Sequence, residues 1–149
     1  MTMGLFTRNS TPEQHVADEA ARFVKSVAKG GHRDDAASLD FSPGSVRALD
    51  TVLARHRGDV DADGVPDAVS LGAACYFFET VRREYGGRLC SGTGSDPLVL
   101  VVGEPDFRLC VPAVSKVVQR TGDAGDPSLE LLWDDVVAHA ARREDATLS

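Results

Sequence analysis

The stretch from Ala68 to Val81 constrains this chain most strongly, because it is apolar on almost every side of the helix that it predicts. We predict a helix from about Asp67 to Tyr85, which the glycines at 86–87 terminate. A helix without a polar face in its first half is enclosed on several sides. The apolar residues give way at Glu79, well short of the roughly 20 that a membrane span needs. We therefore expect this helix to be buried at the centre of the fold.

Two amphipathic helices precede this central helix. The first begins at Thr11-Pro12 and ends at Gly30-Gly31, and the second runs from Ser42-Pro43 to about Arg57. Each begins with a capping hydroxyl followed by proline at the first helical position, a combination typical of helix N-termini. The polar segment from His32 to Asp40 predicts a connection between them.

After the central helix the hydrophobic pattern changes to that of strands. The strand patterns are separated by short turns rich in glycine and proline, which favour an antiparallel meander over parallel crossovers. Two further amphipathic helices follow. We predict strands at 88–90, 97–102 and 107–111, and helices from Pro112 to Thr121 and from Asp126 to about Ala140.

The chain has 149 residues, a length that suits one domain. The order of elements predicts an α+β fold with three N-terminal helices, a three-stranded antiparallel meander and two C-terminal helices. We place this domain at residues 11–143, with a flexible N-terminus at 1–10 and a frayed C-terminus at 144–149.

Charge and cysteine content narrow the functional classes. The formal net charge of −7 argues against a protein dedicated to nucleic acids or anionic membranes, because Lys and Arg supply phosphate affinity. Cys75, Cys90 and Cys110 are odd in number and lack CxxC spacing, which argues against a disulfide framework or zinc site. Cys90 and Cys110 could face each other across neighbouring strands. We expect a cytoplasmic protein, and the predominance of arginine over lysine suggests a bacterial source.

An acidic loop precedes the central helix. Carboxylates at Asp59, Asp61, Asp63 and Asp67, with Gly64 at the sixth place, resemble part of an EF-hand calcium loop. The twelfth place, where that family has a bidentate glutamate, is a serine in this chain. The alternative is a solvated loop in which Asp63 or Asp67 caps the following helix. The loop is therefore a calcium candidate that lacks one ligand.

Glu79 is the second candidate, because it follows the most hydrophobic run of the chain. A partly desolvated carboxylate there could serve as a general acid or base. Arg82 and Arg83 lie three and four residues further on, within reach on one helix. The spacing favours structural ion pairs between Glu79 and these arginines.

Several of these segments together resemble a family of small bacterial proteins of unknown function. The opening Leu39-Asp40-Phe41-Ser42 is similar to the start of the family pattern. Tyr76-Phe77-Phe78-Glu79, Arg82-Arg83 and Gly86-Gly87 are similar to its central helix, and Pro112 to Gly122 to its next helix. The resemblance covers about residues 39–132 and implies an α+β fold but no known reaction.

This chain departs from that family pattern at two positions. Phe78 stands where the pattern has glycine, and Leu89 stands where it has tryptophan. If the glycine of the family leaves room for a groove, Phe78 fills that room here.

Three functional hypotheses follow. The sequence favours a non-enzymatic module that binds an unknown protein partner or itself, because no convergent catalytic set is visible. From Thr121 onward the sequence has seven acidic residues and only two arginines. This acidic excess would steer a basic partner toward the protein. The alternatives are a calcium-binding module built on the acidic loop and a small enzyme that uses Glu79.

Overall fold

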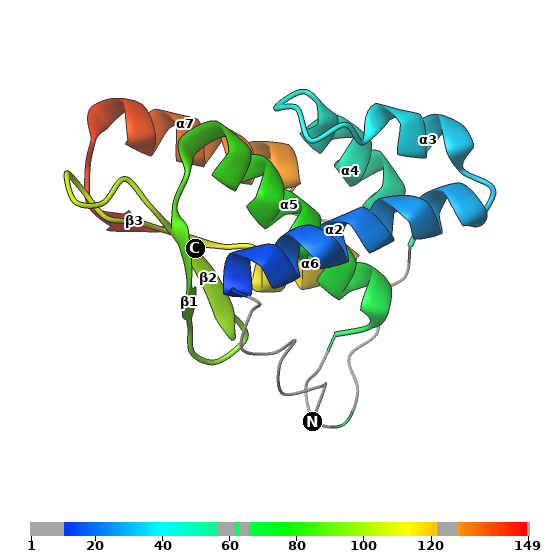
Figure 1. The fold of residues 1–149 in the computed structure, drawn as a ribbon, viewed down its shortest axis with the longest axis horizontal. Helices are drawn as coiled ribbons and strands as arrows, with labels where there is room; N and C mark the ends of the chain where they lie inside the picture. The colour runs from blue at the N-terminus through cyan, green and yellow to red at the C-terminus, as the bar shows by residue number, and fades with distance from the viewer. Residues whose placement is uncertain (1–10, 57–61, 63–65, 122–127, 149) are drawn as a thin grey trace.

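The computed structural model describes residues 11–56, 62, 66–121 and 128–148, and these form an α+β fold with six helices and a four-stranded mixed sheet (Figure 1). The helices are α2 (Pro12–Lys29), α3 (Arg33–Ser38), α4 (Ser45–Ala54), α5 (Ala68–Tyr85), α6 (Val114–Thr121) and α7 (Leu129–Arg142). The strands are β1 (Arg88–Ser91), β2 (Leu98–Val102), β3 (Leu109–Pro112) and β4 (Ala146–Thr147). The α+β class predicted from the sequence is confirmed.

The helix α5 is the core of the molecule, as its composition predicts. Tyr76, Phe77 and Phe78 are 0–1% exposed. The helix α2 packs along it, and Gly72 makes this close approach possible, since a Cβ there would lie 3.0 Å from the Phe23 side chain. Within the described residues, no helix combines the length and hydropathy needed to cross a bilayer.

The sheet contains the predicted meander and one strand more. β1, β2 and β3 pair in antiparallel order, with Leu89 opposite Leu100 and Leu100 opposite Val111 on the core side. β4 then pairs parallel to β3, and Leu148 beyond it donates from its backbone N–H to the Cys110 carbonyl at 3.0 Å. Residues 146–148, which fall in the segment that we expected to be frayed, thus pair with β3. The reason is Leu148, which is 7% exposed and anchors the segment.

A short helix, α3, occupies the segment that we expected to be a connection. Four helices of the described chain, not three, therefore precede the meander. α3 has no buried residue, so no hydrophobic periodicity marks it in the sequence. Asp34 and Asp35 lie in its first turn, where carboxylates are favourable beside the positive end of the helix dipole.

The carboxylate of Asp50 fixes the position of α7. Asp50 lies on α4 and is 7% exposed. It accepts hydrogen bonds from the backbone N–H groups of Leu129 at 2.8 Å and Glu130 at 3.0 Å, and from Nε of Arg120 at 3.2 Å. One buried side chain thus joins α4, α6 and the first turn of α7.

Candidate functional site

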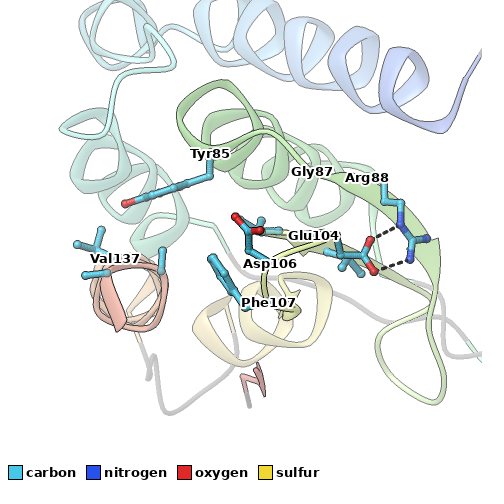
Figure 2. Close-up of a pocket in the computed structure, with 12 residues that line it drawn as sticks. Tyr85, Gly87, Arg88, Glu104, Asp106, Phe107 and Val137 are labelled. Atoms are coloured by element: carbon cyan, nitrogen blue, oxygen red, sulfur yellow. Dashed lines mark hydrogen bonds and ion pairs between the residues drawn. The ribbon is translucent and has the colours of Figure 1, made fainter. Parts of the chain in front are cut away.

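A pocket of about 690 Å³ lies where the β2–β3 turn meets the C-terminal ends of α5 and α7 (Figure 2). This volume is in the usual range of ligand pockets, roughly 300–1,000 Å³. Its apolar walls come from both helices and from the turn. The side chains that form them are Tyr85, Phe107, Val137, Ala140 and Ala141.

Two glycines shape these walls. Gly87 has φ +113°, and a Cβ there would lie 2.6 Å from the Val101 carbonyl oxygen. Gly103 has φ +96°, and a Cβ there would lie 2.4 Å from the Phe107 ring. Only glycine allows both the backbone conformation and the approach. The turn can therefore fold back so that the Phe107 ring packs against the backbone at Gly103.

Two carboxylates that line the pocket, Glu104 and Asp106, form ion pairs. Arg88 donates to Glu104 through Nε at 2.6 Å and through Nη2 at 3.3 Å, and this pairing lowers the pKa of the Glu104 carboxyl. Arg143, just beyond α7, donates through Nη2 to Asp106 at 2.5 Å. Its Cζ lies 5.9 Å from the centre of the Phe107 ring. Each of the two carboxylates, Glu104 and Asp106, is therefore paired with an arginine of this chain.

One side of α7 connects this pocket to a second one. Glu130, Asp134, Val137 and Ala141 recur at three- and four-residue steps, so they form one stripe, which we call the α7 flank. Glu130 and Asp134 line a pocket of about 310 Å³ beside the start of α4. Val137 and Ala141 line the larger pocket. The flank therefore spans about 16 Å of helix between two hollows.

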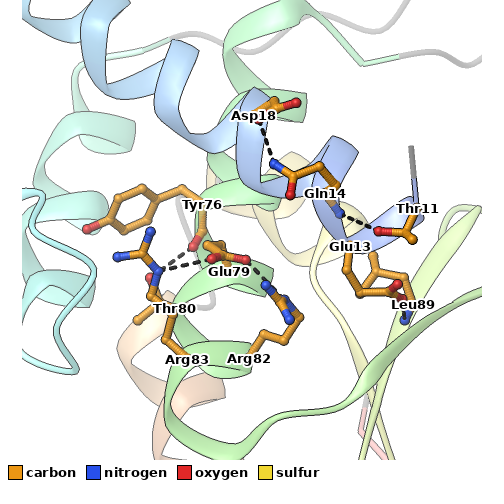
Figure 3. A network of polar contacts seen from close by, with 10 residues as sticks. All are labelled: Thr11, Glu13, Gln14, Asp18, Tyr76, Glu79, Thr80, Arg82, Arg83 and Leu89. Atoms are coloured by element: carbon orange, nitrogen blue, oxygen red, sulfur yellow. Dashed lines mark hydrogen bonds and ion pairs between the residues drawn. The ribbon is translucent and has the colours of Figure 1, made fainter. Parts of the chain in front are cut away.

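Glu79 lies between the two arginines that its spacing predicts (Figure 3). Its side chain is 4% exposed and accepts from Nε of Arg82 at 3.1 Å and from Nε of Arg83 at 3.0 Å. The guanidinium of Arg83 also lies 4.0 Å above the Phe41 ring. Glu79 lines none of the four pockets described for residues 11–56, 62, 66–121 and 128–148. This arrangement holds the two arginines in place.

Phe41 and Tyr76 bring together two of the three segments on which the family resemblance rests. Their rings stack at 4.6 Å, and the Tyr76 hydroxyl accepts from the Phe41 backbone N–H at 2.9 Å. The same hydroxyl lies 2.7 Å from Oγ of Ser45, and burial raises the pKa of Tyr76. Phe41 has φ +63°, which is rare for an aromatic residue. The contacts made by Tyr76 hold this conformation.

Of the calcium candidates, Asp59, Asp61 and Asp63 lie outside the described residues. Asp67 is the N-cap of α5: its Oδ1 accepts from the Ser70 backbone N–H at 2.8 Å, and its Oδ2 lies 2.8 Å from Nε2 of His56. Among the described residues, no group of three or more His, Cys, Asp or Glu side chains could hold a metal ion. Asp67 therefore acts as a helix cap here.

All three cysteines carry free thiols. Cys90 lies opposite Val99 and Cys110 opposite Val101, so β2 lies between these two cysteines and they do not face each other on neighbouring strands. Burial, with a smaller contribution from the charge of Glu19, raises the pKa of Cys75 to about 11. Cys75 is therefore a poor nucleophile at neutral pH.

No family model, curated protein or solved structure matches the chain. The resemblance to small bacterial proteins of unknown function therefore stays a prediction. Sequence reasoning missed the larger pocket, because Arg88, Glu104 and Asp106, which line it, and Arg143, which pairs with Asp106, are scattered over 56 positions. The one signal was the glycine and proline of the turn at 103–106, which predicts a turn and nothing about its surroundings.

Proposed function

We propose that the protein is an interaction module that binds a basic protein partner along the α7 flank. The α7 flank carries this proposal because it connects two pockets on one exposed stripe of helix. Val137, which lies on the flank and lines the larger pocket, is 39% exposed. In protein interfaces, the anchoring side chains of a partner are typically buried in pockets that are flanked by exposed apolar side chains.

The charges of α7 favour a basic partner. Asp134 and Asp135 are exposed, and neither has an ion pair among the residues that the structure describes. The whole chain carries a formal charge of −7. Acidic groups around a contact surface steer cationic partners and raise the association rate. Binding should therefore weaken as the salt concentration rises.

The pairing of the polar groups supports binding over catalysis. Glu104 and Asp106 each hold an arginine at the rim of the larger pocket. Glu79, the candidate acid or base, pairs with two arginines. It lines none of the four pockets found in the part of the chain that the structure describes. A general base needs an acceptor position that can reach a substrate proton. These carboxylates instead have the geometry of surface and fold contacts.

The proposal is tested by selection from a displayed library of random peptides. Peptides selected on the wild-type protein should be enriched in Lys and Arg. They should bind Val137→Asp and Asp134→Lys at least tenfold more weakly, which corresponds to about 1.4 kcal/mol. The matched control is Asp34→Lys, a charge reversal on α3 at the other end of the molecule (Figure 1), which should bind normally.

Two outcomes would contradict the proposal. One is a set of selected peptides without basic enrichment, and the other is equal binding to the Val137→Asp variant and to the wild-type protein. Sedimentation velocity tests the other occupant of this surface, a second copy of the chain. A dimer that Val137→Asp dissociates would replace the basic partner by self-association.

A further inference from the structure

We infer that the larger pocket binds the guanidinium group of an arginine from the partner, at the contact that Arg143 of this chain now makes. This inference rests on the proposed function and names the chemistry of the partner. Arg143 places its guanidinium against one carboxylate and one aromatic ring. The chain itself therefore shows which group this position recognises.

The geometry is that of a guanidinium site. Asp106 accepts from Nη2 of Arg143 at 2.5 Å, and the Phe107 ring lies 5.9 Å from its Cζ. A carboxylate supplies charge-assisted hydrogen bonds, and an aromatic face attracts the planar cation. Figure 2 shows the Asp106 and Phe107 side chains next to each other in the space between Val137 and the Arg88–Glu104 pair. Both recognition elements therefore face the pocket.

The contact made by Arg143 is easily displaced. Its side chain is 63% exposed and that of Asp106 is 60% exposed. Ion pairs at such exposure are screened by water and contribute little to stability. Arg143 also lies beyond the end of α7, so its side chain can turn into solvent without disturbing the helix. A partner's arginine can therefore replace it at little cost.

The apolar walls favour arginine over a small cation. Tyr85 and Val137 line the pocket beside the carboxylate, where they can cover the aliphatic stem of an inserted side chain. A planar guanidinium stacks on a ring and offers paired donors to a carboxylate, whereas an ammonium is a compact, strongly hydrated charge. We therefore expect arginine to bind more tightly than lysine.

The test is a titration of the ¹⁵N-labelled full chain with N-acetyl-L-arginine amide, followed by NMR. The amide signals of Asp106, Phe107 and Ala141 should shift together in a saturable way. The citrulline analogue has the same shape without the charge and should not bind. The lysine analogue should bind several-fold more weakly than the arginine probe.

Variants separate recognition from general charge. Asp106→Asn should weaken binding of the probe about tenfold, since it removes the charged acceptor. Arg143→Gln should tighten binding about threefold, because it removes the internal competitor. Arg142→Gln makes the same change of charge one residue away, where the side chain pairs with Glu144, and should leave the affinity unchanged. Thermal melts should show that all three variants fold.

The inference is overturned if citrulline and arginine amides bind alike, or if the shifts map elsewhere. It is also overturned if Arg143→Gln and Arg142→Gln tighten binding equally, because that result reports only net charge. Failure of the arginine probe, together with selected peptides that still depend on Val137, would remove this inference and leave the proposed function standing.

Discussion

Two pairs of carboxylates in this molecule hold arginine, and they differ in burial. Asp50 and Glu79 have side chains that are 9% and 4% exposed, whereas those of Glu104 and Asp106 are 37% and 60% exposed. Asp50 joins three helices and Glu79 holds two arginines of its own helix, whereas Glu104 and Asp106 line the larger pocket. Burial, not the presence of an arginine partner, therefore distinguishes these two pairs, and we propose that only the exposed pair is available to a ligand.

The physical reason is desolvation. A carboxylate taken out of water needs its hydrogen bonds inside the protein, and removal of either partner leaves the other one buried without them. An exposed carboxylate exchanges its protein partner for water at little cost. The same substitution should therefore have opposite consequences in the two regions: loss of stability in one, and loss of binding in the other.

The largest expected effect is that of Asp50→Ala. The substitution removes the acceptor of two backbone N–H groups in α7 and of Arg120, so the free energy of unfolding should fall by about 3 kcal/mol. Urea denaturation followed by circular dichroism measures it. Asp34→Ala on the exposed surface of α3 is the control and should change stability very little. A loss for Asp50→Ala as small as that of the control would contradict the structural role of Asp50.

Glu79→Ala should have the next largest effect, about 2 kcal/mol of lost stability. The loss is smaller than for Asp50→Ala because Arg82 and Arg83 are 32% and 52% exposed and can turn to water. Denaturation of the variant measures this loss. Peptides selected on the wild-type protein should bind the variant with unchanged affinity, and a parallel loss of binding would place Glu79 in the contact surface.

Asp67→Ala removes the N-cap of α5 and should cost about 1 kcal/mol. Asp67→Asn keeps an acceptor for the Ser70 N–H and should recover most of that loss, so the two variants together isolate the cap. Differential scanning calorimetry gives both values. Equal stability of the wild-type protein and Asp67→Ala would mean that the cap hydrogen bond contributes nothing.

The same residue predicts the response to calcium. Because Ser70 and His56 already engage the two Asp67 oxygens, millimolar calcium should leave the melting temperature unchanged relative to chelator. Binding to the native state alone would raise that temperature. A rise that Asp67→Ala abolishes would restore the calcium site predicted from the sequence.

Asp106→Asn should have the smallest effect on stability, below about 0.5 kcal/mol, since its ion pair is exposed. The variant should nevertheless lose affinity for the arginine probe, which is the reverse of the behaviour of Glu79→Ala. Denaturation and NMR titration on one preparation measure both quantities. A loss of stability comparable to that of Asp50→Ala would remove the distinction between the two regions.

Hydrophobic pattern predicted the elements that bury a face. The all-round apolar composition of Ala68 to Val81 predicted a central helix, and the branched residues at 97–102 predicted a central strand of the meander. The pattern missed α3, which buries nothing, and β4, which is two residues long. Segments without a periodic apolar face leave no signal for this kind of reasoning.

The candidate sites divide in the same way. The contacts of Glu79 with Arg82 and Arg83 follow from helical spacing, because residues three and four apart lie on the same side of a helix. The pair of Asp106 with Arg143 joins the β2–β3 turn to the end of α7, across 37 residues. Nothing local in the sequence connects them, so only the fold brings this part of the pocket together.

A crystal structure of the full chain with N-acetyl-L-arginine amide tests the central claim most directly. The account predicts a guanidinium bound to the Asp106 carboxylate and stacked on Phe107, with the Arg143 side chain turned into solvent. A probe bound elsewhere, or an Arg143 that stays on Asp106 while the pocket remains empty, would contradict it.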